Sequence, residues 1–281
     1  MTRPYRSVLY IPASKQRALE KARGLAADAI IFDLEDAVLP EEKAAARVTL
    51  ARFLAEVDYG PRLRIVRING LDTPWAREDA AVFGGLAAVD AILVPKVDGV
   101  AVLDAVAGMT DKPLWAMMET ARGMLNAGVI AAHPRLEGLV MGTNDLAKEL
   151  GSRFRADRLP MMAGLGMCLL AARAEGRVII DGVYNSFRDH DGLRAECLQG
   201  RDMGFDGKTL VHPDQLAVAN EVFAPSEDEV ALARRQIEAF ATARAAGQGV
   251  AVLDGKIVEN LHVAGAEAVL GRAEAIAALA D

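Results

Sequence analysis

The sequence is poor in aromatic residues and in cysteine, and it has no long apolar run. Phe, Trp and Tyr make up 5% of the 281 residues, and cysteine occurs only as Cys168 and Cys197. The cysteines lack metal-ligand spacing, and Cys168 lies in the apolar run MCLL, so we expect two reduced structural thiols. No window reaches the roughly 18 apolar residues of a membrane span, and the N-terminal MTRPYR has no apolar signal core. These absences favour a protein of the reducing cytoplasm.

The sequence also lacks a basic run. Its 32 Lys and Arg residues are outnumbered by 39 Asp and Glu residues, which gives a net charge of −7. Nothing in this pattern would neutralise a phosphate backbone, so we expect no nucleic-acid partner. An anionic ligand would need single basic residues placed locally against the overall negative field.

Short apolar runs alternate with longer stretches of helical periodicity. The apolar fraction is 52%, which suits helices packed on a buried parallel sheet. The runs are nearly continuous rather than alternating, as expected for strands buried on both faces. We predict strands at 7–11, 29–34, 63–68, 91–94, 114–118, 138–141, 178–181 and 207–211, with helices that include 15–27, 41–57, 74–88, 100–108 and 190–203. Eight such βα units predict a (β/α)₈ barrel over residues 1–225.

Residues 226–281 depart from the βα pattern. They predict a charged helix at 227–246, a break at Gly247-Gln248-Gly249, a short extended piece and a last helix at about 261–279. The segment is too short for a core of its own. We therefore expect a C-terminal extension that packs on its own barrel or on a neighbouring subunit.

Polar residues follow the predicted strands where the βα loops begin, the place where barrels of this kind carry their chemistry. The segments are DLED at 33–36, RIN at 67–69, PK at 95–96, ET at 119–120, GTND at 142–145 and VHP at 211–213.

Two of these strand ends deliver carboxylates, Glu119 and Asp145. Two anions that converge without a cation would raise the pKa of one of them. Because Mg²⁺ is commonly held by one or two carboxylates, with substrate oxygens and waters completing its shell, a metal site is one interpretation. The alternative is that Glu119 pairs with Arg67 or Arg122 and that Asp145 caps the following helix.

The basic residues at strand ends leave similar alternatives open. Arg67 keeps its charge, so it faces either an anionic ligand or a salt bridge to Glu35, Asp36 or Glu119. His212 is either a base or a buried hydrogen-bonded imidazole. Lys15, Arg17 and Lys21 could bind phosphates, or could simply form the solvated face of a helix. Gly142 would permit close backbone approach to a ligand.

Several segments together resemble the citrate lyase β-subunit-like branch of the HpcH/HpaI aldolase family. They are RSVLYIP at 6–12, IFDLEDAV at 31–38, VRING at 66–70, META at 118–121, GTNDL at 142–146 and DGKIV at 254–258. The likeness covers nearly the whole chain in the right order. AKELGSR at 147–153 and the run 247–262 are most similar to the members of this branch that hydrolyse malyl-CoA.

The resemblance implies a Mg²⁺-dependent thioesterase, with Mn²⁺ as a substitute metal, that assembles as a homotrimer or homohexamer. Glu119 and Asp145 match the metal ligands, and Arg67 matches the arginine that contacts the thioester carbonyl. Glu35 and Asp36 match an acidic pair that supports the waters around the metal. The remaining matches are to substrate contacts: Tyr10, Lys15 and Lys21 toward CoA, Asn144 and Asp145 toward the acyl group, and Val211 and His212 beside the pantetheine.

The C-terminal segment departs from the lyases of this family. Where they carry a catalytic aspartate, this sequence has Glu259, with Asp254 earlier in the same turn. A glutamate reaches about one methylene further, which matters where placement tolerances are roughly 0.5 Å. The functions that stay open beside hydrolysis are a malyl- or citramalyl-CoA lyase, a citrate lyase β subunit and a noncatalytic CoA-ester-binding protein.

Overall fold

The computed structural model describes residues 3–279, which divide into two compact units. One unit is Tyr5–Glu221, and the other runs from Val222 to the C-terminal end of the described chain and includes residues 3–4. The first unit holds all six strand-end segments at which the sequence predicts the site.

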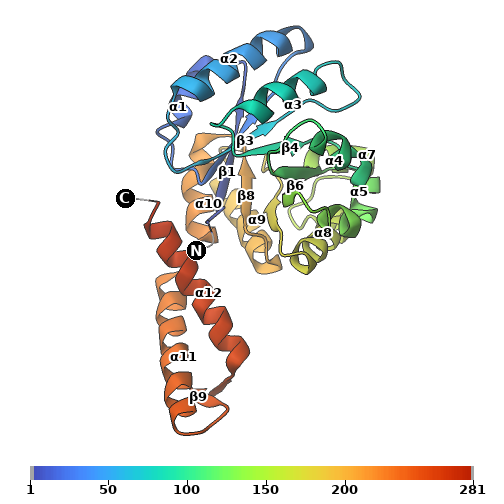
Figure 1. The fold of residues 1–281 in the computed structure, drawn as a ribbon. Helices are drawn as coiled ribbons and strands as arrows, with labels where there is room; N and C mark the ends of the chain where they lie inside the picture. The colour runs from blue at the N-terminus through green and yellow to red at the C-terminus, as the bar shows by residue number, and fades with distance from the viewer. Residues whose placement is uncertain (1–2, 280–281) are drawn as a thin grey trace. The chain divides into compact units, whose positions relative to one another are not determined.

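Within Tyr5–Glu221, eight parallel strands close into a barrel in chain order, β1 pairing with β8 (Figure 1). The predicted (β/α)₈ fold is confirmed. The strands are β1 (Ser7–Pro12), β2 (Ala29–Asp33), β3 (Leu63–Arg67), β4 (Ala91–Val94), β5 (Leu114–Met118), β6 (Leu136–Met141), β7 (Val178–Asp181) and β8 (Gly207–Leu210). Strands β4, β5 and β7 have the predicted bounds, because each is a short apolar run that is buried almost throughout.

Helices surround the barrel (Figure 1). They are α1 (Gln16–Ala22), α2 (Lys43–Glu56), α3 (Ala76–Gly85), α4 (Val100–Ala107), α5 (Ala121–Leu125), α6 (Ala127–Ala131), α7 (Thr143–Glu149), α8 (Met162–Ala174), α9 (His190–Met203) and α10 (Leu216–Phe223). The helix predicted at 15–27 is shorter in the structure, where α1 covers Gln16–Ala22. It ends at Ala22 because the chain must turn to bring the Asp28 amide to the carbonyl of Ser7, at 3.1 Å.

The barrel interior is a packed core rather than a channel, as is usual for this fold. Inward-facing side chains from successive strands fill it, among them Val8, Ile31, Ile65, Leu93 and Trp115, all at most 1% exposed. Cys168 and Cys197 are buried free thiols, as expected.

Ion pairs between arginine and aspartate join neighbouring segments at the N-terminal end of the barrel. Asp28 precedes β2 and accepts two side-chain hydrogen bonds from Arg6, of 2.9 and 2.7 Å. Asp90, before β4, binds Arg64 in the same forked way. Because these forks lie at the end of the barrel opposite the βα loops, their role is structural.

The C-terminal unit contains two long helices, α11 (Glu227–Ala245) and α12 (Asn260–Ala277), joined through the antiparallel pair β9 (Ala251–Leu253) and β10 (Lys256–Val258) (Figure 1). Its small core consists of Phe240, Ala243, Ala251 and Val258. Val252, Ile257 and Leu261 are each more than 60% exposed. The packing of this extension on another surface stays a prediction.

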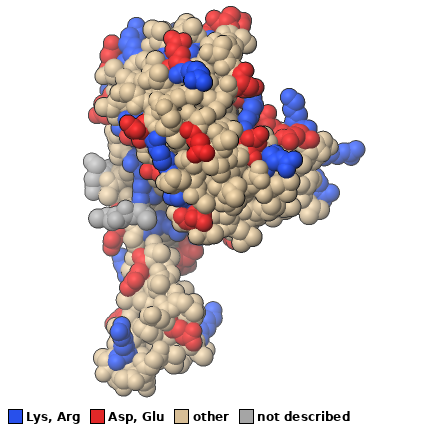
Figure 2. Space-filling view, turned by 45° about the vertical axis from the view of Figure 1, so that its right-hand side comes forward, with Lys and Arg blue, Asp and Glu red and all other residues tan. Residues whose placement is uncertain are grey.

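No helix in residues 3–279 is both long and apolar enough to span a bilayer. On the face shown in Figure 2, acidic and basic side chains are intermingled rather than gathered by sign.

Candidate active site

A pocket of about 340 Å³ opens at the C-terminal ends of the barrel strands. Polar residues from several strand ends line it together with apolar ones. Six of the residues predicted for the site are among its walls: Tyr10, Asp36, Arg67, Asn144, Asp145 and Val211. Met117, Met141 and Val183 supply apolar wall, so a ligand would meet both charged and apolar side chains.

Arg67 is the last residue of β3, and carboxylates from the neighbouring β2 end bind its guanidinium. Its Nε and Nη2 donate to the two oxygens of Asp33 at 2.7 and 2.6 Å, and Nη1 lies 2.8 Å from Glu35 Oε2. The Tyr10 ring lies under the guanidinium, 5.2 Å from Cζ to the ring centroid. Arg67 therefore forms the predicted salt bridge to Glu35 and also lines the pocket, and its contact with an anionic ligand stays a prediction.

Glu35 lies behind Arg67 and is almost fully buried. Its Oε1 is 3.0 Å from Lys96 Nζ and its Oε2 is 2.8 Å from Arg67 Nη1, although neither oxygen forms a hydrogen bond of good geometry with a described residue. Burial raises the pKa of Glu35, while the Arg67 charge opposes that shift. Asp36, by contrast, is mostly exposed and lies 3.7 Å from Arg67 Nη1.

Glu119 follows β5 and has only one of its oxygens satisfied. Oε1 accepts a hydrogen bond of 2.7 Å from the Lys96 amide, but Oε2 is buried without a hydrogen-bond partner among the described residues. Burial, together with the charges of Glu35 and Asp145, raises the pKa of Glu119 to about 7. The sequence alternatives in which Glu119 pairs with Arg67 or Arg122 are wrong, because its bonded partner is a backbone amide.

The carboxylate of Glu119 reaches its position because residue 142 is a glycine. A Cβ at Gly142 would lie 2.4 Å from Glu119 Cβ and 2.6 Å from Glu119 Oε2. The Glu119 side chain therefore approaches the Gly142 backbone closely, whereas the predicted close approach of a ligand to Gly142 stays a prediction. Asp145 does not cap α7, since Gly142 is the N-cap residue, and it lies instead in the first turn of that helix.

These carboxylates suit a hard divalent cation. An orphaned buried oxygen on Glu119 and a pKa raised by neighbouring acids are both relieved by a positive charge at that point. Residues 3–279 contain no cluster of three or more His, Cys, Asp or Glu side chains arranged for a metal. A site built from two carboxylates would leave the other coordination positions to substrate and water, which is the usual arrangement for Mg²⁺.

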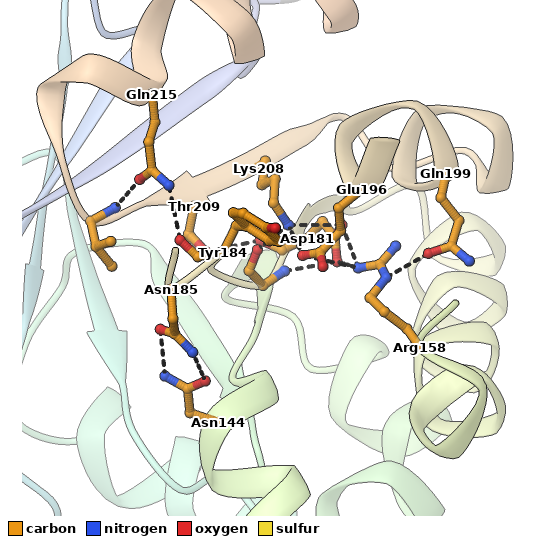
Figure 3. Close-up of polar contacts among 12 residues, drawn as sticks. Asn144, Arg158, Asp181, Tyr184, Asn185, Glu196, Gln199, Lys208, Thr209 and Gln215 are labelled. Carbon is orange, nitrogen blue, oxygen red and sulfur yellow. Dashed lines mark hydrogen bonds and ion pairs between the residues drawn. The ribbon is translucent and has the colours of Figure 1, made fainter. Parts of the chain in front are cut away.

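Asn144 is tied to the loop that follows β7. Its side-chain amide exchanges two hydrogen bonds with that of Asn185, of 3.2 and 2.8 Å (Figure 3). On the other side of the same loop, Gln215 donates to the Tyr184 carbonyl and accepts from the amides of Val211 and His212. The βα loops of β6, β7 and β8 therefore form one connected wall.

A buried ion cluster lies beneath that wall (Figure 3). Asp181, fully buried, is bound by Arg158 at 2.7 Å and lies 3.3 Å from Lys208 Nζ. Lys208 also binds Glu196 at 2.6 Å. Asp181 and its two basic partners are buried while Glu196 is partly exposed, and these ion pairs hold the loop in place. Arg158 Nη2 is buried without a hydrogen-bond partner among the described residues.

Besides Glu35 and Glu119, three predicted contacts in the barrel unit are not among the pocket walls, namely Lys15, Lys21 and His212. Lys15 and Lys21 are exposed at the two ends of α1. His212 was expected to be either a base or a buried imidazole; the buried imidazole is wrong, whereas the role of a base stays a prediction. Its ring is 40% exposed, accepts the Asp214 amide through Nδ1 and stacks on Phe187 with 4.5 Å between centroids. It caps a short 3₁₀ turn, so its position follows from loop geometry.

Asp254 and Glu259 lie in the C-terminal unit. Asp254 has a φ of 51° in the turn between β9 and β10, and its Oδ1 is 2.6 Å from Arg235 Nη2. Glu259 is the N-cap residue of α12, and its amide donates to His262 Nδ1 at 3.0 Å. Both are exposed.

Sequence reasoning missed two residues of the site. Asp33 was considered only as part of a strand end, yet it is opposite Arg67 in the β2–β3 register. Lys96 bridges Glu35 and Glu119 from a backbone with φ of 52°, which is uncommon outside glycine. The register could have indicated Asp33, since both residues end adjacent parallel strands, whereas no local signal indicated the backbone of Lys96.

The fold and the pocket define a (β/α)₈ barrel protein with an acidic, arginine-containing site at the C-terminal strand ends. The model of the HpcH/HpaI aldolase/citrate lyase family matches residues 6–213, and the chain belongs to that family.

Curated relatives span almost the whole chain. A (3S)-malyl-CoA thioesterase of Cereibacter sphaeroides is 68% identical over 276 residues, covering 98% of this chain and 96% of the relative. An L-malyl-CoA/β-methylmalyl-CoA lyase of the same species is 33% identical over 309 aligned positions, with the same coverage. Among solved structures, the protein CitE of Mycobacterium tuberculosis in complex with magnesium, acetoacetate and coenzyme A has a TM-score of 0.81 and 32% identity, covering 96% of this chain and 98% of its own.

Proposed function

We propose that this protein is a thioesterase that hydrolyses (3S)-malyl-CoA to malate and CoA in a Mg²⁺-dependent reaction. The observation that carries the proposal is the 68% identity to a (3S)-malyl-CoA thioesterase over 98% of the chain. The pocket supports it, because its walls include the Arg67 guanidinium, the carboxylates of Asp36 and Asp145, and apolar side chains.

Glu119 and Asp145 are the residues that would hold Mg²⁺, with Mn²⁺ as a substitute. When bound there, the metal would orient the hydroxyl and carboxylate oxygens of the malyl group and neutralise the acidic end of the pocket. That M. tuberculosis CitE was solved in complex with magnesium and coenzyme A supports a magnesium site in this chain.

Arg67 would stabilise the negative charge that develops on the thioester oxygen. Attack by water on the carbonyl carbon converts the C=O bond to an oxyanion, and a guanidinium already aligned in a dry site stabilises that charge without reorganising. When the intermediate collapses, the C–S bond breaks and the sulfur leaves as the thiolate of CoA, which becomes the thiol by taking up the proton that the base removed from water. Asn144, fixed by Asn185, would hydrogen-bond to the acyl group.

A carboxylate must take the proton of the attacking water. We assign this role to the C-terminal segment, to Glu259 or to Asp254, and give Glu35 and Asp36 the role of accepting hydrogen bonds from water in the pocket. The apolar walls, among them Met141 and Val183, would limit the entry of other water.

The remaining substrate contacts belong to the same proposal. Tyr10 and Val211 line the pocket and would border the pantetheine, with His212 beside them. Lys15 and Lys21, exposed on α1, would meet the phosphates of CoA. We further propose a cytoplasmic homotrimer or homohexamer in which the C-terminal segment of one subunit serves the pocket of another.

A lyase reaction is the second candidate, because the lyase relative at 33% identity also covers 98% of the chain. Incubation with malyl-CoA and Mg²⁺, with free thiol and glyoxylate measured in parallel, separates the two. A thioesterase releases thiol and malate without glyoxylate. Glyoxylate and acetyl-CoA in equal amounts would establish a lyase, and the absence of both products would refute the proposed substrate.

A further inference from the structure

Asp33 and Arg67 face each other at the ends of neighbouring strands. They are paired in the β2–β3 register, and both Asp33 oxygens accept hydrogen bonds from the guanidinium, at 2.7 and 2.6 Å. This bidentate arrangement fixes both the position and the plane of the guanidinium, which a single contact could not do.

The same carboxylate also holds the loop that follows β2. Asp33 Oδ1 accepts the Glu35 amide at 2.8 Å, and Oδ2 accepts the Ala37 amide at 3.2 Å. Each oxygen therefore has two donors from the protein, and the residue is only 2% exposed. With its acceptor positions taken in this way, Asp33 has little capacity left for a metal or a substrate proton, although it lies at the pocket.

We propose that Asp33 is a positioning residue for the hydrolysis assigned above, on which this inference rests. It sets the guanidinium of Arg67 toward the thioester oxygen, and through the loop backbone it places Glu35 and Asp36. It acts through these residues and not by touching the substrate. Nothing in the sequence pattern separates Asp33 from its two acidic neighbours, whereas the four hydrogen bonds do.

The fold supplies a matched control at the opposite end of the same strand. Asp28 is also 2% exposed, and it binds Arg6 through a similar fork while accepting the Arg6 amide at 2.7 Å. It lies at the N-terminal end of the barrel, away from the strand ends that form the pocket. Breaking the Arg6–Asp28 ion pair therefore measures how much the loss of a buried ion pair lowers stability, without an effect on the pocket.

The test compares Asp33→Asn with Asp28→Asn. An asparagine keeps the shape but replaces one acceptor by a donor, so one arm of the Arg67 fork is lost. For Asp33→Asn we expect kcat to fall on the order of 10²-fold, with KM changed by no more than about threefold. For Asp28→Asn we expect a lower melting temperature with kcat within about twofold of the parent.

Two further measurements exclude a merely structural effect. Asp33→Glu keeps the charge but displaces it by a methylene, and it should also lose kcat, since roughly 0.5 Å is enough to misplace an active-site group. Adding Asp33→Asn to Arg67→Lys should cost little beyond Arg67→Lys alone, because both act through one interaction.

A readout independent of turnover separates this inference from the proposed function. The Nε–H resonance of Arg67, identified by its loss in Arg67→Lys, should shift in ¹⁵N spectra of Asp33→Asn and stay in place in Asp28→Asn. If the parent protein does not hydrolyse malyl-CoA, the proposed function fails while this measurement still tests the geometry. Full kcat in Asp33→Glu, or an unmoved Arg67 resonance in Asp33→Asn, would overturn the positioning role.

Discussion

The amide of Lys96 donates a hydrogen bond of 2.7 Å to Glu119 Oε1, while Glu119 Oε2 is buried without a partner among the described residues. The backbone of Lys96 adopts the left-handed region to make this bond, with φ of 52°. A residue in a sparsely populated backbone region thus holds one oxygen of a buried carboxylate, which is the kind of cost that proteins carry at functional sites.

The first prediction is a pH dependence of stability in metal-free protein. Folding raises the pKa of Glu119 from 4.5 to about 7, so its contribution to stability is present below pH 4.5 and is lost as pH rises through about 7. Metal-free protein should therefore melt at a lower temperature at pH 8 than at pH 5.5. Glu119→Gln removes this titration, so the melting temperatures at the two pH values should differ less. Part of the difference should remain, because the pKa of Glu35 is also raised.

Added Mg²⁺ should reverse that loss, because it binds the ionised carboxylate and stabilises the folded state by mass action. Thermal melts with Mg²⁺ and with EDTA at the two pH values measure this. An equal Mg²⁺-induced shift in the parent protein and in Glu119→Gln would contradict the assignment of Glu119 as a ligand.

Replacement of Asp145 by alanine should abolish turnover and leave the fold intact. The residue is partly exposed in the first turn of α7, where loss of an acidic side chain costs about 0.3–1 kcal/mol. Asp191→Ala is the control, because Asp191 holds the equivalent place in α9. Thiol release measured over a range of Mg²⁺ concentrations should vanish in the first variant and persist in the second, and activity in Asp145→Ala or in EDTA would refute the metal site.

Arg67→Lys should lower kcat on the order of 10²-fold, as expected for the loss of an oxyanion donor. Lysine keeps the charge but lacks the planar fork that fits Asp33. Arg6→Lys breaks a comparable fork at the other end of the barrel and should leave kcat unchanged. If steady-state kinetics of Arg67→Lys showed a change in KM alone, the residue would bind the substrate and transition state equally and would not act in the chemical step.

The sequence predicted the barrel well and the site only in part, for a physical reason. A buried parallel strand is a local apolar run, and β4, β5 and β7 could be delimited from composition. The partners of Arg67 depend on register: of the three neighbouring acids, Asp33 is the one opposite it. Helix α8 escaped prediction because its apolar residues lack a clear polar face, and the position of His212 depends on a cap and a ring stack that composition does not encode.

Gly142→Ala should impair the metal site by displacing Glu119. A methyl group would lie 2.6 Å from Oε2, closer than unbonded atoms tolerate, and the carboxylate would have to move. Gly166→Ala in α8 is the control, because its methyl group would meet nothing within 4 Å, and it should stabilise the helix by up to about 1 kcal/mol. Calorimetric titration should show that Mg²⁺ binds more weakly to Gly142→Ala than to the parent, and equally well to Gly166→Ala and the parent. An unchanged Mg²⁺ affinity in Gly142→Ala would contradict the role of Gly142.

The last prediction concerns the C-terminal segment, for which we propose action between subunits. The segment carries Asp254 and Glu259 as exposed carboxylates, and apolar side chains such as Val252 and Ile257 remain exposed beside them. Arg67→Ala should lack the oxyanion donor, and Glu259→Ala should lack the base. If the segment serves a neighbouring pocket, mixing the two inactive variants under subunit exchange should restore activity, because some pockets receive an intact Arg67 and an intact Glu259.

The size of the recovery follows from statistics. For equal mixing of a trimer with one segment per pocket, about a quarter of the pockets should combine the two intact residues, so activity should approach roughly 25% of the parent, whereas segments acting within their own subunit would recover none. Mass spectrometry of isotopically labelled variants confirms that exchange has occurred. Exchange without recovery would show that the segment acts within its own subunit, and full activity of Glu259→Ala alone would transfer the role of base to Asp254, which Asp254→Ala would then test.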